Sequence, residues 1–150
     1  MDPFSLEDHA HIPLSQDAAL VAALAGTAMP FARSAEDQAE RWLRALRLHG
    51  RVGEAMQALG IGEAPLMTRA EPSATRDTAA PPGDVAAHAV AIASDLAAKR
   101  GASCVGTLDL LFALFEIYGG LIGRALYLRG ASKDELLARL ATMEPAESIY

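Results

Sequence analysis

Residues 82–140 read PGDVAAHAVAIASDLAAKRGASCVGTLDLLFALFEIYGGLIGRALYLRGASKDELLARL, and their apolar positions recur at helical spacing. Asp84 precedes the first apolar run and can accept hydrogen bonds from the free amide groups of a helix start. Glycines at Gly101, Gly119-Gly120 and Gly130 divide the rest. The pattern predicts four consecutive helices: over 85–99, from a cap at Thr107 to the Gly119 turn, over 121–128 and over 132–140.

A weaker copy of this pattern lies earlier in the chain. Ala45-Leu46 precedes Ala113-Leu114 by 68 positions and Gly60 precedes Gly130 by 70, so two residues are gained in between. A fixed period with a small loop insertion is typical of stacked repeats. The copy predicts helices after Ser15, after Ser34 and over 52–59. We expect the apolar sides of the two central helices to consist of Trp42, Leu43, Leu46 and Leu48 in the first copy and of Leu110, Leu111 and Leu114 in the second.

Short motifs of the second copy resemble one repeat of the amino-terminal domain of Clp-type chaperones. They are Arg100-Gly101, Val105-Gly106-Thr107, the run Leu110-Leu111-Phe112-Ala113-Leu114, and Arg129-Gly130. The family domain is a tandem of two such repeats, so the resemblance implies an all-α, pseudo-twofold bundle of two four-helix-like repeats. It also implies a non-catalytic module that docks substrate or adaptor proteins of the Clp proteolytic system.

The resemblance implies a peptide-binding surface near the starts of the two repeats, at Leu14, Glu40, Arg41, Leu108 and Asp109. The family carries a Glu, usually followed by His, after each helix start, and in some Clp chaperones this Glu helps to bind phosphorylated arginine. Here Glu40 precedes Arg41, whereas Leu108 replaces the second Glu. We therefore expect the second half of the groove to prefer apolar side chains, and the whole surface to suit a basic or amphipathic segment. A plainer interpretation of Glu40 is a helix-start acid stabilised by the helix dipole.

An aromatic-threonine pair usually opens each family repeat, and its ring lies in the groove where peptides and some cyclic peptide antibiotics bind. This chain has Leu14-Ser15 and Pro82-Gly83 at these places. Because an aromatic ring supplies a large contact area, the loss of both rings predicts an altered groove.

The chain divides by composition into five segments that we expect to form one compact domain. Residues 1–13 form an arm with little periodicity, and 144–150 form a tail. The first repeat spans 14–62 and the second spans 84–143. Between them, residues 63–83 contain four prolines and read as a linker.

Composition excludes several classes of function. The formal net charge is −6, which argues against a nucleic-acid partner. Cys104 is the single cysteine, and the chain does not open with a basic, apolar leader, so we expect a cytoplasmic protein. The apolar window 108–128 contains Asp109, Glu116 and Arg124, each of which costs about 2.5–3.5 kcal/mol near a bilayer centre, so we expect no membrane span.

No catalytic or cofactor motif stands out. The sequence contains neither G-x-x-x-x-G-K-[ST] nor G-x-S-x-G, so we expect no ATPase or hydrolase activity and no cofactor. His9 and His11 could supply part of a metal shell, but two ligands in an arm do not make a site. We expect a docking module, either the front of a longer Clp ATPase or a stand-alone adaptor, decoy or antibiotic-resistance factor. The alternative is a small-molecule sensor or an enzyme that uses the apolar cleft between the repeats.

Overall fold

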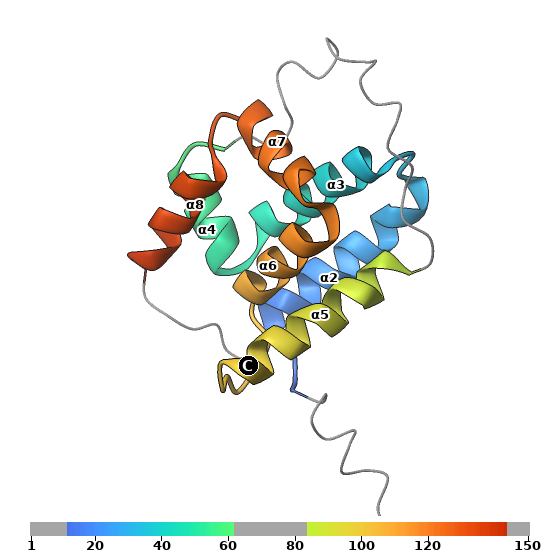
Figure 1. Ribbon diagram of the computed structural model, residues 1–150, viewed down its shortest axis with the longest axis vertical. Coiled ribbons are helices and arrows are strands. Elements are labelled where there is room, and N and C mark those ends of the chain that lie inside the picture. Colours follow the sequence, from blue (N-terminus) through green and yellow to red (C-terminus); the bar gives the residue numbers. More distant parts are fainter. Residues whose placement is uncertain (1–11, 62–83, 144–150) are drawn as a thin grey trace, which may run out of the picture.

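The computed structural model describes residues 12–61 and 84–143, which form seven α-helices and one short 3-10 helix (Figure 1). These are α2 (Gln16–Ala28), η1 (Met29–Phe31), α3 (Ala35–Leu48), α4 (Gly50–Ala58), α5 (Val85–Lys99), α6 (Thr107–Tyr118), α7 (Gly120–Leu128) and α8 (Lys133–Ala141). The described residues contain no strand, so the all-α class is confirmed. The predicted linker, the tail and all but the last two residues of the arm lie outside them.

Side-chain caps begin most of the helices where the sequence predicts them. The Ser15 hydroxyl accepts a hydrogen bond from the Ala18 amide at 3.0 Å, and the Ser34 hydroxyl accepts one from the Asp37 amide at 3.1 Å. The Asp84 carboxylate caps α5 in the same way, through the Ala87 amide at 3.1 Å. Each cap satisfies an amide that the helix leaves unpaired, and is worth about 1 kcal/mol.

The start of α6 differs from the prediction. Thr107 is the first residue of the helix and not its cap, because Gly106 holds the capping position. The Thr107 hydroxyl instead accepts a hydrogen bond from the Val52 amide of α4 at 3.3 Å. It therefore joins two helices from opposite halves of the chain.

One continuous core lies between the helices. The predicted burial of Trp42, Leu43 and Leu46 in α3 and of Leu110, Leu111 and Leu114 in α6 is confirmed, since all six are 0% exposed. The placement of Leu48 on the same side is wrong, because this residue is 48% exposed. Two residues beyond Leu46, it is rotated by about 200° around the helix and leaves the buried face.

The helices of the two halves pack against one another. α3 contacts α2, α4 and α7, and α6 contacts α5, α4 and α7. α2 and α5 lie side by side along one edge of the molecule, while α4 and α8 form the opposite edge (Figure 1). α4 and α7 have 9 residues each and begin 70 positions apart in the sequence. The core is thus shared between the halves.

A glycine permits the close approach of α3 and α4. A Cβ atom at Gly53 would lie 2.6 Å from the Leu46 carbonyl oxygen and 2.8 Å from that of Arg47. Such distances are too short for any side chain, so position 53 requires glycine if α4 is to keep this distance from α3.

α6 and α7 are separated by a sharp bend. Gly119 has φ +56°, and the two helix axes differ in direction by 112°. Together the pair is long and apolar enough to resemble a broken membrane span, but within the described residues no single helix meets the length and hydropathy of a span. Leu111, Leu114 and Ile122 are fully buried in the bundle, so the expectation of two buried helices joined by a turn is confirmed.

A buried polar contact joins α3 to α6. The Tyr118 hydroxyl donates a hydrogen bond to Gln38 Oε1 at 2.7 Å, and both residues are buried. Burial raises the pKa of Tyr118 to about 12, an effect that the neighbouring Trp42 partly opposes. At neutral pH the phenol is therefore protonated and remains the donor of this contact.

Candidate functional site

Among the predicted site residues, Asp109 accepts the most hydrogen bonds through its side chain. Its carboxylate accepts a hydrogen bond from the Gly106 amide at 2.9 Å, and this contact caps α6. It also forms a two-point ion pair with Arg100 at the end of α5, in which Arg100 Nε donates to Oδ1 at 3.0 Å. The Asp109 side chain is 3% exposed, and its hydrogen bond raises the pKa of Arg100. This carboxylate therefore holds the α5–α6 loop in place and has little surface to offer a partner.

Leu14 lies beside the same loop. Ser15 N donates to Val105 O at 2.8 Å, and Val105 N donates to Pro13 O at 2.8 Å. These two bonds form an isolated parallel bridge between Leu14 and Val105. Leu14 is half-buried and packs on the core, and its pairing with Val105 places it beside the start of α6.

Glu40 occupies a different environment from the helix start that we expected. It is the sixth residue of α3, which begins one turn earlier, and it is half-buried. Burial raises the pKa of Glu40; the neighbouring Arg129 opposes this shift, whereas Asp37 and Glu36 add to it. Arg129 is itself buried at the end of α7, and this burial lowers its pKa. Glu40 is therefore a partly desolvated acid at the contact between α3 and α7.

A second ion pair reinforces the contact between α3 and α7. Arg124 Nε of α7 lies 3.1 Å from Glu36 Oε2 of α3, one helical turn before Glu40. Both glutamates of α3 thus interact with arginines of α7. The sequence around Glu36 and Glu40 does not predict these partners, because they lie about 90 residues further along the chain.

Arg41 points to the other side of α3. Its Nε lies 3.1 Å from Asp37 Oδ1, one helical turn earlier. Together with Arg44 it lines a hollow between α2 and α3 of about 170 Å3. The Arg41 side chain is 28% exposed and is thus more accessible than that of Asp109.

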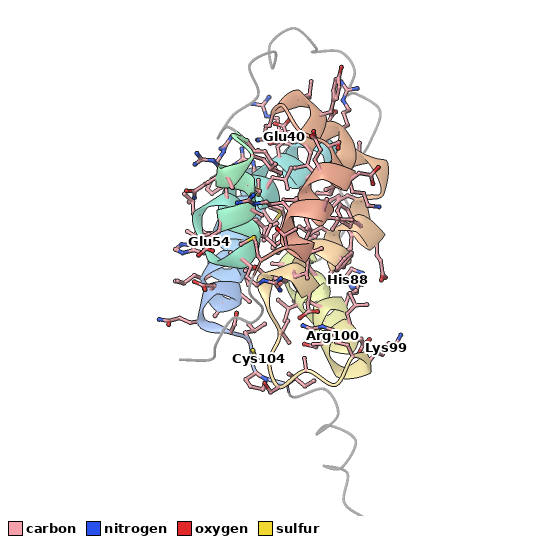
Figure 2. The ribbon with its side chains drawn as sticks, turned by 90° about the vertical axis from the view of Figure 1, so that its left-hand side faces the viewer. Glu40, Glu54, His88, Lys99, Arg100 and Cys104 are labelled. Carbon is pink, nitrogen blue, oxygen red and sulfur yellow. The ribbon has the colours of Figure 1, made fainter. Side chains whose placement is uncertain are left out.

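The five predicted residues do not form one continuous surface. Figure 2 shows Glu40 near one end of the molecule and Arg100, the partner of Asp109, near the other. Leu14, Leu108 and Asp109 lie close to the loop that joins α5 to α6, because Val105 bonds to the residues around Leu14. Glu40 and Arg41 lie apart from them on α3. The expectation of a single groove touching all five residues is therefore not met.

Leu108 lines a groove that the sequence did not reveal as a whole. This groove, called the Leu108 groove below, measures about 310 Å3 and is lined by Arg51, Leu108, Phe112, Leu137, Leu140, Ala141 and Met143. Phe112, one turn after Leu108, is 39% exposed. At the rim, Arg51 Nη2 donates to the Leu140 carbonyl at 3.1 Å and fixes α4 to the end of α8. The groove is therefore apolar, and Arg51 is the one charged residue that lines it.

No group of three or more His, Cys, Asp or Glu side chains lies close enough together to hold a metal ion in residues 12–61 and 84–143. His9 and His11 fall outside these ranges. Cys104 is half-buried in the α5–α6 loop, where Figure 2 places it near the end of the molecule marked by Arg100.

No family model matches the chain, and no curated protein matches it in sequence. The function is therefore to be inferred from the surfaces described above. Of these, the Leu108 groove is lined by six apolar residues and one arginine, and it contains a residue that the family resemblance also singles out.

Proposed function

We propose that this chain is a non-catalytic protein- or peptide-docking module built from two tandem helical repeats, similar to the amino-terminal domain of Clp-type chaperones. It would bind apolar or amphipathic segments of substrate or adaptor proteins in the cytoplasm. The observation that carries the proposal is the Leu108 groove, an open apolar surface at a position where the resemblance implies ligand contact.

The packing of the helices supports the two-repeat part of the proposal. α3 of the first half contacts α7 of the second, and α4 of the first contacts α6 of the second. A twofold rotation that exchanged the halves would also exchange these two contacts. The glycines Gly60 and Gly130, 70 positions apart, both have positive φ after α4 and α7. Matching helix ends and reciprocal contacts are what a duplicated unit produces.

The shape of the Leu108 groove favours a peptide over a compact ligand. Its volume of about 310 Å3 falls at the lower end of the range for small-molecule pockets, about 300–1,000 Å3, and it is open to solvent. Such a groove suits one or two apolar side chains of a longer segment. Phe112 would supply the aromatic contact area that binding sites for proteins commonly contain.

Charge favours apolar recognition over the capture of a cationic group. Asp109 is already neutralised by Arg100, and Glu40 is half-buried beside Arg129. Arg51 is the one charged residue among those that line the groove, and its guanidinium already donates to the Leu140 carbonyl. We therefore propose that the partner contributes apolar side chains, and that phosphoarginine is not the preferred ligand of this groove.

Peptide titration of the isotope-labelled chain, followed by amide shift mapping, tests the proposal. The probes are an unphosphorylated amphipathic peptide and free phosphoarginine. We expect the peptide to shift the amides of Leu108, Phe112 and Leu137 and phosphoarginine to leave them unchanged. Phe112→Ala should weaken binding of the amphipathic peptide by about 1–2 kcal/mol, a loss of affinity of about fivefold to thirtyfold, because it removes an aromatic contact.

Tyr127→Ala provides the matched control, since it removes an aromatic side chain that is 75% exposed on α7 and outside the groove. It should leave the peptide affinity unchanged. Equal losses for the two variants, or tight phosphoarginine binding centred on Leu108 and Asp109, would contradict the proposal.

A further inference from the structure

A second surface has a chemical character different from that of the Leu108 groove. It lies between α2 and α3, is called the arginine groove here, and is lined by Leu24, Ala28, Arg41, Arg44, Ala45 and Leu48. Its residues are contributed by one half of the chain, whereas the Leu108 groove is built from α4, α6 and α8.

Exposed leucines are concentrated on this face. Leu24 is 41% exposed and Leu48 is 48% exposed, and both line the groove. Leu20, one turn before Leu24 on α2, is also 41% exposed. These three are half of the six large apolar side chains that are exposed within residues 12–61 and 84–143. A cluster of exposed apolar side chains, unlike a single one, indicates a surface that another molecule covers.

The charge of the arginine groove is opposite to that of the whole protein. The chain carries a net charge of −6, yet the lining residues include two arginines and no acid. From residue 18 to residue 28, α2 has no charged side chain, and every charged residue of α3 from Arg41 onward is an arginine.

The two arginines differ in what they already bind. Arg41 is paired with Asp37 at 3.1 Å. Arg44 is exposed and forms neither a hydrogen bond nor an ion pair through its guanidinium within the described part of the chain. Its charge influences the pKa values of Glu40 and Arg129. Arg44 is therefore the cation that is available to a partner.

The size of the hollow indicates what kind of group enters it. At about 170 Å3 it is smaller than the roughly 300–1,000 Å3 of small-molecule pockets, so it suits one apolar side chain of a larger partner. A groove between two helices accepts a third helix whose apolar residues recur at one-turn spacing. Carboxylates beside those residues would complement Arg41 and Arg44, because opposite potentials favour association.

We propose that the arginine groove binds an acidic amphipathic helix of a partner protein, with an apolar side chain between Leu24 and Leu48 and carboxylates against Arg41 and Arg44. This inference rests on the docking function proposed above and adds a second surface with its own charge preference. The two surfaces can then hold two different segments, or two parts of one partner.

Fluorescence anisotropy with the full chain tests this proposal. The probe is a labelled helical peptide of about 15 residues with leucines at one-turn spacing and flanking glutamates, and its matched control has lysine at every glutamate. We expect the glutamate peptide to bind about tenfold or more tightly than the lysine peptide. Arg44→Glu should lower the affinity for the glutamate peptide by about threefold to tenfold and raise the affinity for the lysine peptide.

Arg139→Glu makes the same change in net charge at an exposed position on α8, outside the arginine groove. It should change the affinity of either peptide by less than about twofold. Equal effects of Arg44→Glu and Arg139→Glu, or equal affinities of the two peptides, would overturn the proposal. Circular dichroism of each variant confirms that the helices are retained.

Two further outcomes separate this proposal from the docking function as a whole. Leu108→Asp should leave the glutamate peptide unaffected, because Leu108 does not line the arginine groove. If the amphipathic peptide binds the Leu108 groove and the glutamate peptide does not bind, the proposal for the arginine groove is wrong and the docking function is retained. If neither peptide binds, both proposals are wrong. Self-association of the free chain that Leu24→Gln abolishes would assign the groove to a second copy and overturn the proposal.

Discussion

α3 and α6 occupy corresponding places in the two halves of the chain, but they use their polar residues differently. α6 has one acid at its start, Asp109, which is buried and bound to both a backbone amide and Arg100. α3 has three acids in its first two turns, and each has a different partner: Glu36 pairs with Arg124, Asp37 with Arg41, and Glu40 lies beside Arg129.

The difference separates two ways of stabilising a central helix. In α6 a single buried carboxylate makes several charge-assisted hydrogen bonds, which are strong because little water competes with them. In α3 the acids are partly exposed. Asp37 accepts hydrogen bonds from Arg41 and from the Arg33 amide, and Glu36 pairs with Arg124, but ion pairs at exposed positions are individually weak. The apolar sides of both helices are equally buried, so the two halves should differ in their polar contacts and not in their core.

The largest expected effect tests the equality of the cores. Leu43→Ala and Leu111→Ala remove side chains that lie 68 positions apart and are both 0% exposed. Each should lower the free energy of unfolding by about 2–5 kcal/mol, a large part of the roughly 5–15 kcal/mol typical of a domain. Urea denaturation followed by the fluorescence of Trp42, the single tryptophan, measures both.

Leu20→Ala, at a position that is 41% exposed, serves as the reference. It should lower the free energy of unfolding by less than Leu43→Ala or Leu111→Ala does. A variant that unfolds in two steps would show that the halves have separate cores.

The next effect concerns the ion-paired acids near the starts of α6 and α3. Asp109→Asn should cost about 1.5–3 kcal/mol, because it replaces charge-assisted hydrogen bonds in a buried site. Asp37→Asn should cost about 0.2–1 kcal/mol, as for other exposed ion pairs. Thermal denaturation in low and high salt distinguishes the two ion pairs. About 1 M salt screens the exposed pair of Asp37 and Arg41 and leaves the buried pair of Asp109 and Arg100 largely intact. Equal costs would mean that burial does not set the strength of these contacts.

The smallest expected effect is a dependence of stability on pH from Glu40. Burial raises the pKa of this carboxyl in the folded state above its ordinary value of 4.5. Between that value and the folded pKa the native state binds more protons than the unfolded state, so this group lowers stability as pH rises. Glu40→Gln should remove this contribution and make the protein slightly more stable at neutral pH. The measurement is urea denaturation from pH 4 to pH 7 for both proteins; a variant that is less stable at neutral pH would show that the contact with Arg129 outweighs the cost of burial.

Local chemistry explains why the helices of this fold were predictable. Ser15, Ser34 and Asp84 cap helices where their positions before apolar runs predict it, because a cap depends on residues only three positions away. The prediction that Thr107 caps α6 is wrong, because its hydroxyl binds the Val52 amide of α4 and the capping acid Asp109 is held by Arg100, contacts that depend on how the helices pack.

The candidate site was less predictable, because it depends on contacts between distant segments. Leu108 was predicted to contact a peptide, and in the structure it lines a groove. The other walls of that groove come from α4 and α8, whose placement beside α6 no local pattern encodes. In the same way, nothing near Glu40 in the sequence indicates that Arg129 lies beside it.

The pairing of Leu14 with Val105 has a consequence for the order of folding during synthesis. Ser15 N cannot reach Val105 O until a further 90 residues, up to and including Val105, have been made, which at about 5–20 residues per second takes roughly 5 to 18 s. α3 must likewise wait for α7, and α4 for α6. The first half of the chain therefore leaves the ribosome with its apolar faces uncovered, and the nascent protein completes its core only when the second half has emerged.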